Sequence, residues 1–308
     1  MPSLKTIRKR IVSVKNTRKI TRAMKLVAAA KLRRAQDTMT SARPYAAAIS
    51  TVVSELSGVA GREAHPLFEE RGTKRVQVVV VTSDRGLAGA FNANVIKTVE
   101  RAAQNELSGA TEVTLRLIGK KANQHFARRN ATIASYQVAP TSATALQVAR
   151  ETANQIIDDF VNGKVDRVFI AYNEFKSAGS QVVRLTQILP VVPGPAALPS
   201  GPGPTTTAIA TKDAHAPSDS AGTDYVYEPS KEELLSRLVP LFVQIQIYRA
   251  SLESIAAFFG AQMMAMENAT KNAGEMINRY TLQYNRARQA SITKELLEII
   301  GGAEALKG

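Results

Sequence analysis

Residues 83–87 (Ser-Asp-Arg-Gly-Leu) come closest in residue type to an active site. They follow residues 76–82 (VQVVVVT), a β-branched run typical of a strand buried on both faces. Ligands of open α/β sheets often bind beyond such a strand, where backbone N–H groups of the next helix can hold an anion. No acid–base pair or nucleophile converges on this turn, however. We therefore favour a structural role, in which Asp84 caps the turn or a helix and Gly86 permits a tight bend.

The residue inventory argues against most other chemistry. The 308 residues include no cysteine, which excludes disulfides, thiolate nucleophiles and cysteine-ligated metals. His65, His125 and His215 are too far apart in the sequence to predict a metal site. The sequence contains no P-loop, dinucleotide-binding, nucleophile-elbow or HExxH motif. We therefore expect no catalytic residue, no cofactor and no metal.

Positive charge is concentrated at the N-terminus. The formal net charge is +14, and residues 1–36 carry twelve lysines and arginines without one acidic residue. This basic arm consists of Lys5, Arg8, Lys9, Arg10, Lys15, Arg18, Lys19, Arg22, Lys25, Lys31, Arg33 and Arg34. Like charges at i, i+4 spacing destabilise an isolated helix, so we favour a negatively charged partner over a merely solvated helix face. No apolar run reaches the roughly 18–20 residues that span a bilayer.

Two long helices must position these charges. A strict heptad beginning at Leu4 places apolar residues at nine of twelve positions within residues 3–57. A second heptad, beginning at Leu238 within residues 230–300, has apolar residues or tyrosine at thirteen of sixteen positions, Met263 and Met266 among them. The pattern predicts two long helices. Because the segment between them joins the far end of one helix to the near end of the other, we expect them to pack as an antiparallel coiled coil.

Proline, serine and glycine residues predict where these helices bend, begin and end. Ser230 and Glu233 form the pattern of a capping box at the start of the second helix. We expect Pro44 to kink the first helix. Two glycine pairs are expected to end the helices, namely Gly58 with Gly61 and Gly301 with Gly302.

The middle of the chain alternates strand and helix patterns, which predicts a parallel sheet covered on both faces. Helices are expected after the 83–92 turn to about residue 105, over 120–130 and over 142–162. The expected strands are 76–82, 113–119, 132–136, 167–173 and 181–189, and the last two are expected to form a hairpin at the sheet edge.

The predicted fold class is therefore α/β plus a long antiparallel α-helical coiled coil, with a small doubly wound α/β domain inserted between the two terminal helices. Prolines cluster with glycine, alanine, serine and threonine after the last strand, which is typical of a flexible loop. The predicted boundaries are 1–60 for the N-terminal helix, 74–190 for the α/β domain, 191–226 for the Pro/Gly-rich loop and 228–303 for the C-terminal helix.

Three segments closely resemble the gamma subunits of F-type ATP synthases. They are residues 7–36 (IRKRIVSVKNTRKITRAMKLVAAAKLRRAQ), 83–95 (SDRGLAGAFNANV) and 267–303 (ENATKNAGEMINRYTLQYNRARQASITKELLEIIGGA). The resemblance implies a non-catalytic central rotor shaft, present in one copy, which proton or sodium flow through a membrane ring turns inside alternating alpha and beta subunits. The implied partners are the alpha, beta and epsilon subunits and the membrane c-ring.

The resemblance also implies a location. The chain begins directly at the family's first helix, which favours a bacterial protein over an organellar precursor. The implied place is peripheral, at the cytoplasmic face of the bacterial plasma membrane.

The resemblance also implies which residues contact the partner subunits. Arg288, Gln289 and Thr293 match polar positions that contact the catalytic ring near the shaft tip, and Met24 and Lys25 match a segment near the lower rim of the beta subunits. Residues 292–300 resemble a tip held in an apolar bearing. Together with Lys25, the basic-arm residues expected to face acidic loops of the ring are Lys5, Arg8, Lys9, Lys15, Arg18, Lys19 and Arg22.

Three departures from the family pattern lie in the second long helix. Phe258, Phe259 and Gln262 replace an acidic residue, a polar residue and an arginine, so any charged contact that the family makes there is in doubt.

Two alternative functions stay open. One is a basic coiled-coil protein that binds nucleic acid, although residues 1–44 lack aromatic side chains for base stacking. The other is a small-ligand α/β enzyme that uses the 83–87 turn.

Overall fold

A computed structural model describes residues 3–60, 65–105, 107, 109–192 and 230–305. The chain divides into two compact units. Unit 1 combines Met1–Ala30 with Gln262–Gly308, and unit 2 is Lys31–Ala261. All but the first two residues of the predicted loop 191–226 lie outside the described residues.

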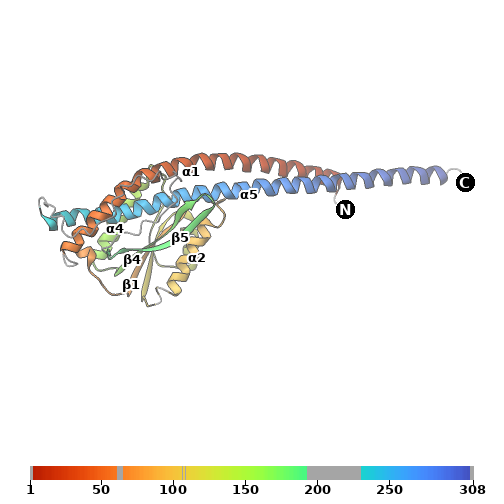
Figure 1. The fold of residues 1–308 in the computed structure, drawn as a ribbon. Coiled ribbons are helices and arrows are strands. Elements are labelled where there is room, and N and C mark those ends of the chain that lie inside the picture. Colours follow the sequence, from red (N-terminus) through yellow and green to blue (C-terminus); the bar gives the residue numbers. More distant parts are fainter. Residues whose placement is uncertain (1–2, 61–64, 106, 108, 193–229, 306–308) are drawn as a thin grey trace, which may run out of the picture. The chain divides into compact units, whose positions relative to one another are not determined.

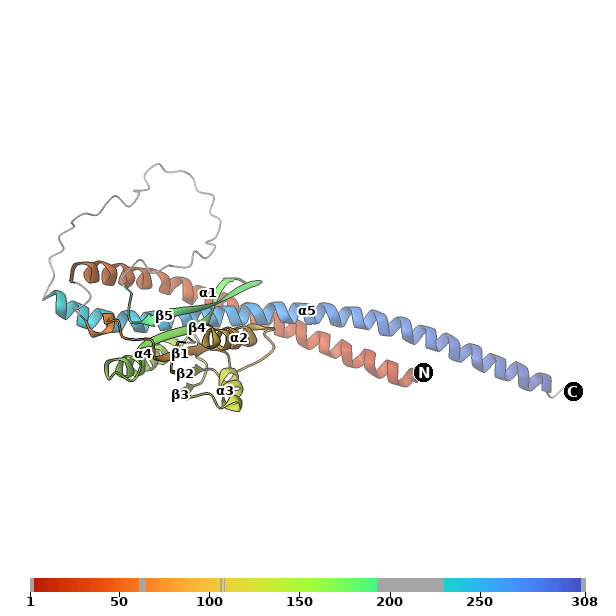
Figure 2. The same cartoon turned by 90° about the horizontal axis from the view of Figure 1, so that it is seen from below.

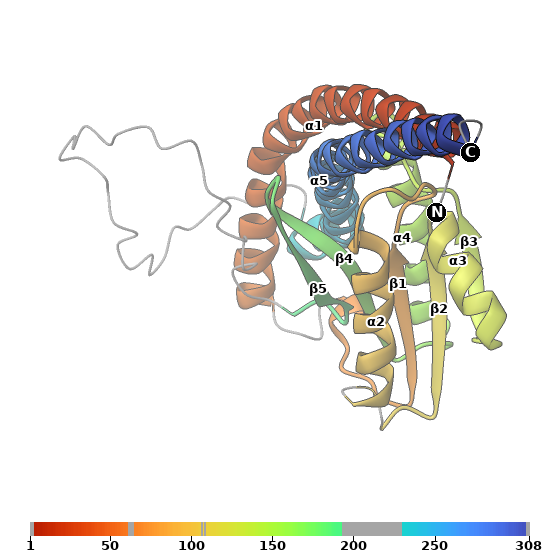
Figure 3. The ribbon, with the colours of Figure 1, turned by 90° about the vertical axis from the view of Figure 1, so that its right-hand side faces the viewer.

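Unit 2 contains one five-stranded sheet. Its strands are β1 (Arg75–Val81), β2 (Glu112–Ile118), β3 (Ile133–Gln137), β4 (Arg167–Ser177) and β5 (Ser180–Leu189). The order is β3-β2-β1-β4-β5, with parallel pairing except between β4 and β5. The predicted parallel sheet with a hairpin at one edge is therefore confirmed (Figure 3).

Helices cover both faces of this sheet. Alternate residues of a strand point to opposite sides, so β1 contributes side chains to two cores. Val76, Val78 and Val80 of β1 pack with α2 (Phe91–Gln104) and α3 (Lys120–Phe126), which the 3-10 turn η3 (Ala127–Arg129) follows. Val79 and Val81 face a second core with α4 (Ala145–Val161) and the 3-10 turn η2 (Pro66–Phe68). Figure 3 shows α2 and α4 on opposite sides of the sheet.

The terminal helices are α1 (Leu4–Ala60) and α5 (Lys231–Ala305) (Figure 1). Ser230 begins α5 as predicted, since its Oγ accepts a hydrogen bond of 3.2 Å from the Glu233 N–H. The predicted stops are wrong at Gly58, Gly301 and Gly302, all of which stay helical. A glycine inside a helix costs only about 1 kcal/mol relative to alanine, so it does not by itself end one. Pro44 lies within α1, and the kink expected there stays a prediction.

In unit 1, α1 and α5 run antiparallel. Thr21 Oγ1 lies 2.7 Å from Thr270 Oγ1, and Lys25 Nζ lies 2.6 Å from Glu267 Oε1, so the numbering rises along one helix as it falls along the other. The buried positions agree with the heptads: they are Ile7, Thr21 and Ala28 on α1, and Met266, Ala273 and Ile277 on α5. The predicted antiparallel pairing of the terminal helices is confirmed here.

In unit 2, the start of α5 is buried on a second stripe that the heptad did not predict. This stripe belongs to the same core as α4 and the sheet, and it consists of Leu235, Val239, Val243, Ile247 and Ala250. The heptad residues Leu238 and Phe242 are only partly buried. A two-stranded coiled coil needs one apolar seam per helix, whereas a helix that packs on several elements needs a wider one.

Candidate functional site

The 83–92 turn satisfies its own polar groups. The Ser83 N–H donates to Asn92 Oδ1 at 2.9 Å, and Ser83 Oγ donates to the Arg85 carbonyl at 2.7 Å. Asp84 Oδ1 accepts from the backbone N–H of Lys120 at 2.8 Å and of Ala139 at 3.2 Å. Asp84 is therefore a cap, as expected, and the helix that it caps is α3, at the neighbouring strand.

Gly86 does not have the conformational role predicted for it. The positive φ angles of this turn are at Leu87 (63°) and Gly89 (55°). A leucine in the left-handed region is unusual, and its side chain is 61% exposed. Gly86 has open space around it rather than a close contact. Because Ser83 and Asn92 bond each other and Asp84 bonds backbone N–H groups of Lys120 and Ala139, the turn supports the structural role.

No group of three or more His, Asp or Glu side chains in the described residues could hold a metal ion. The described helices also include none that is long and apolar enough to cross a membrane. The remaining candidate from the sequence is an interaction surface on the two terminal helices.

The basic arm lies on exposed faces of α1. Lys5, Arg8, Lys9, Lys15, Arg18, Lys19 and Arg22 are all exposed. Met24 and Lys25 are partly buried. Lys25 already has an acidic partner within the chain, because it pairs with Glu267 of α5. Among described residues, it is the one member of the basic arm that forms an ion pair, so most of this charge is unneutralised.

The C-terminal part of α5 presents an exposed polar group followed by exposed apolar side chains. Arg288, Gln289 and Thr293 are exposed, and Thr293 Oγ1 donates to the Gln289 carbonyl at 3.0 Å, one turn earlier. The exposed apolar side chains beside and beyond this group are Ile292, Leu296, Leu297, Ile299 and Ile300, at 49–68% exposure. The three tip residues thus lie exposed on one stretch of α5, and their contact with a partner stays a prediction.

The aromatic departures at Phe258 and Phe259 form a packed cluster in unit 2. The Phe258 ring makes edge contacts with Phe91 of α2, at 5.5 Å between centroids, and with Phe259, at 5.3 Å. Lys31 Nζ lies 5.6 Å from the Phe259 centroid. Here α5 therefore packs by aromatic and cation–π contacts.

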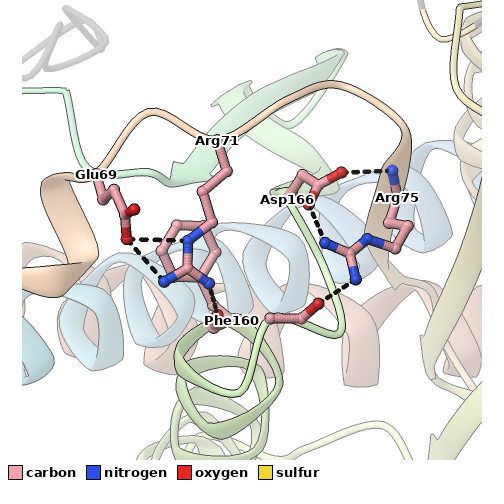
Figure 4. Close-up of polar contacts among 6 residues, drawn as sticks. Glu69, Arg71, Arg75, Phe160 and Asp166 are labelled. Carbon is pink, nitrogen blue, oxygen red and sulfur yellow. Dashed lines mark hydrogen bonds and ion pairs between the residues drawn. The ribbon is translucent and has the colours of Figure 1, made fainter.

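A charged clamp, which the sequence patterns do not predict, lies at the start of β1. Asp166 Oδ1 lies 2.6 Å from Arg75 Nη2, and Asp166 Oδ2 accepts from the Arg75 N–H at 2.9 Å (Figure 4). Arg71 pairs with Glu69 at 2.7 Å, and its guanidinium lies 4.7 Å from the Phe160 ring centroid. The hydrogen bond from Arg75 holds the pKa of the buried Asp166 carboxyl below its usual value, against the effect of burial. The clamp ties the segment before β1 to the α4–β4 turn, so its role is structural.

Comparisons with known proteins bear on the whole chain. The family model described as ATP synthase matches residues 3–306. The ATP synthase gamma chain of Anaeromyxobacter sp. (strain K) is 46% identical over 310 residues, with 100% of both chains covered. The gamma chain of Geobacter sp. (strain M21) is 44% identical over 308 residues, again with 100% of both covered.

Two solved structures share the fold. A chain of the rotor of Euglena gracilis mitochondrial ATP synthase, in rotational state 1, has a TM-score of 0.59 at 18% identity and covers 94% of this chain and 98% of its own. A chain of the central stalk and c-ring of Tetrahymena thermophila mitochondrial ATP synthase has a TM-score of 0.55 at 23% identity, with 81% and 99% covered. These comparisons give no support to the alternative that the chain is a nucleic-acid-binding protein. The end-to-end match to curated gamma chains, together with the paired terminal helices and the inserted sheet, shows that the chain belongs to the ATP synthase gamma-chain family.

Proposed function

We propose that this chain is the central-stalk rotor of an F-type ATP synthase and couples ion flow through a membrane ring to ATP synthesis or hydrolysis. The end-to-end identity of 46% to a curated gamma chain carries the proposal. A gamma chain is a non-catalytic subunit of ATP synthase, and the catalytic sites belong to the beta subunits. The structural role of the 83–92 turn agrees with a non-catalytic subunit.

The proposed partners are the alpha and beta subunits, epsilon and the c-ring, in a hetero-oligomer with one copy of this chain. The solved chains that share the fold come from a rotor and from a central stalk with its c-ring. The proposed location is peripheral, at the cytoplasmic face of a bacterial plasma membrane, and the coupling ion is a proton or sodium.

The exposed basic arm suits a surface that must turn past its partner. An exposed ion pair is worth about 0–1 kcal/mol, so contacts to acidic loops can break and form again at each step. Lys25 differs from the rest of the arm, since it would have to exchange Glu267 for a partner's carboxylate. Because both side chains of that pair are partly exposed, at 34% and 47%, the exchange costs little.

The tip is the second proposed contact. A hydrogen bond to a charged group is worth roughly 1.5–3 kcal/mol net. A contact of Arg288 that forms in one rotary state and is absent in another would therefore shift the step equilibrium about ten- to a hundredfold. Gln289 and Thr293 share one helix face with each other, which supports a polar contact of limited width.

The rotor assignment is tested by co-purification. We expect the tagged full-length chain, produced in cells with its partner subunits, to retain two larger nucleotide-binding chains in fixed stoichiometry. The exposed apolar residues of α5 should make the chain alone poorly soluble. A monodisperse, soluble monomer that binds neither large subunit would contradict the proposal.

The tip contact is tested in the purified complex with Arg288→Ala and Gln289→Ala together. We expect normal assembly with slower hydrolysis and slower ion-driven synthesis. Arg279→Ala with Gln283→Ala is the matched control, because these residues are of the same types, exposed, and on the same helix. Wild-type rates in both directions for the tip variant would remove this contact from the mechanism.

A further inference from the structure

Two carboxylates lie buried where α5 crosses the β4–β5 hairpin in unit 2. Glu174 of β4 is 2% exposed, and Glu253 of α5 is 4% exposed. Carboxylates are seldom this buried unless they are paired. Figure 2 shows β4 and β5 beside α5, and the shared apolar core includes Tyr172 of β4 and Ala250 of α5.

Charged groups reach this place from β4, β5, α5 and α1. Arg184 Nε of β5 donates to Glu174 Oε2 at 2.8 Å. Arg249 Nε of α5 lies 3.7 Å from Glu253 Oε1, which is an ion pair without a hydrogen bond. Arg43 of α1, Arg184 and Glu174 also act electrostatically on Glu253, and Glu253 and Arg249 act on Tyr172.

Two members of this group are incompletely satisfied. Glu253 Oε2 and Arg249 Nε are both buried and have no hydrogen-bond partner. Burial raises the pKa of Glu253 to about 7; Arg249 opposes this rise and the charge of Glu174 adds to it. The carboxyl therefore changes charge near neutral pH, inside the contact between helix and hairpin.

A second contact lies two turns further along α5. A Cβ on Gly260 would lie 3.3 Å from the backbone of Ala178, at the β4–β5 turn, and 3.3 Å from the Phe175 ring. The helix therefore passes close to the hairpin turn. The charged group and this contact form what we call the hairpin joint: Tyr172, Glu174, Arg184, Arg249, Glu253 and Gly260, with Arg43 facing it from α1.

An apolar interface alone does not fix how a helix is placed along a sheet, because neighbouring apolar side chains can replace one another. The Glu174–Arg184 and Arg249–Glu253 pairs lie within the hairpin and within α5, respectively. The contacts that cross from the helix to the hairpin are the interactions of Glu253 with the Glu174 and Arg184 charges, that of Arg249 with Tyr172, and the close approach of Gly260 to Ala178. Buried polar contacts add little stability but can specify one register, because a shifted helix would lose them. We propose that the hairpin joint fixes the register of α5 on the β4–β5 hairpin, so that torque passes between the sheet and this helix without slip. This inference rests on the proposed rotor function.

The joint is strongest when Glu253 is protonated, because a buried carboxyl with a raised pKa favours its neutral form. Between the ordinary pKa and about 7 the folded joint holds a proton that the opened joint releases, so opening becomes easier as pH rises. Above about pH 7 no further change is expected. Between pH 5.5 and 8 the opening equilibrium should increase by roughly 30-fold.

The first test is hydrogen exchange of α5 amides around residue 253 in the assembled complex, corrected for the intrinsic pH dependence of exchange. Wild type should show the rise up to pH 7, and Glu253→Gln, which resembles the protonated form, should not. Glu275→Gln, an exposed carboxylate on the same helix, is the control and should keep the wild-type profile. A wild-type profile in Glu253→Gln would overturn the role of Glu253.

The second test is ATP-driven ion pumping per ATP hydrolysed, with the complex reconstituted in vesicles. Glu253→Ala and Arg184→Ala should hydrolyse ATP but pump several-fold less ion per ATP, and Glu253→Gln should restore the ratio. Unchanged pumping per ATP in both alanine variants would overturn the joint while leaving the rotor function intact. A wild-type complex that hydrolyses ATP without pumping would count against the rotor function itself. If the alanine variants do not assemble, the exchange profile of Glu253→Gln decides.

Discussion

The clamp around Asp166 allows a stability prediction that can be worked out from its geometry. We expect Asp166→Asn to loosen the start of β1 and β4. The carboxylate accepts two hydrogen bonds, from the Arg75 guanidinium at 2.6 Å and from the Arg75 backbone N–H at 2.9 Å. Asparagine has almost the same shape but only one acceptor oxygen, so its amide group must face one of these donors.

The expected loss follows from the kind of bond removed. A hydrogen bond to a charged group is worth about 1.5–3 kcal/mol net. The side chain of Arg75 is 45% exposed, so water partly replaces the lost contact and the lower half of this range applies. A loss of about 2 kcal/mol corresponds to a roughly 30-fold increase in local opening.

Hydrogen exchange in the assembled complex measures this opening amide by amide. Asp158→Asn is the matched control, because Asp158 is exposed on α4. We expect the increase for amides at the start of β1 and β4 in Asp166→Asn, and no increase in the control. Equal protection of these amides in the two variants would refute the reasoning, since it would mean that the carboxylate charge contributes nothing to the clamp.

The pH dependence provides a second check on the same residue. The pKa of Asp166 is lower in the folded chain than its ordinary value of 3.8. Its stabilisation is therefore fully present above about pH 4 and is lost as pH falls through the lowered pKa. Wild type should lose protection of the clamp at acid pH, and Asp166→Asn should lack that particular loss.

Two further predictions concern the sheet and the basic arm. Gly119 has a φ of 103°, and a Cβ there would lie 2.3 Å from the Thr82 carbonyl oxygen. Gly119→Ala should therefore lower the thermal unfolding midpoint of the complex-bound chain by several degrees. Gly109→Ala is the control and should not lower it, because Gly109 has open space around it. Single alanine replacements of Lys15, Arg18, Lys19 and Arg22 should be nearly silent in ATP-driven pumping, because each exposed pair is weak, while the fourfold replacement should reduce coupling. A large loss from one of the single replacements would indicate a buried ion pair instead.

Local sequence patterns were sufficient to predict the strands and the positions of most helices. The β-branched run 76–82 predicted β1 to within one residue, since a strand buried on both faces has few other compositions. The pairing in unit 1 followed from the heptads, and its antiparallel direction followed from the domain that connects the two helices. The prediction that Gly301 and Gly302 end the second helix is wrong, because the end of a helix depends on the conformation of the residues that follow it as well as on helix propensity.

Long-range polar contacts could not be predicted in the same way. The capping role of Asp84 follows from its residue type, but its partner Lys120 is 36 residues away and is reached only through the pairing of β1 with β2. Glu174 and Glu253 were missed for the same reason. One local signal was available, since Glu174 interrupts the apolar run RVFIAYNEF, and a charge inside a buried strand requires a partner.

The burial of α5 decreases along its length. Its start is stabilised by contacts within the chain, whereas its end would gain stability from a partner. Leu235 to Ala250 supply a stripe to the core of unit 2, so this part of the helix is held by the chain itself. Between Met266 and Ile277 only a narrow stripe is buried, which is typical of a helix packed on one neighbour. From Ile292 to Ile300 the large apolar side chains are half or more exposed. Apolar surface contributes roughly 25 cal/mol per Å² when it leaves water, so the last segment has most to gain from a surrounding partner. This gradient agrees with the expectation that residues 292–300 are held in an apolar bearing of the partner subunits, since the earlier parts of α5 pack against their own chain and these side chains remain exposed.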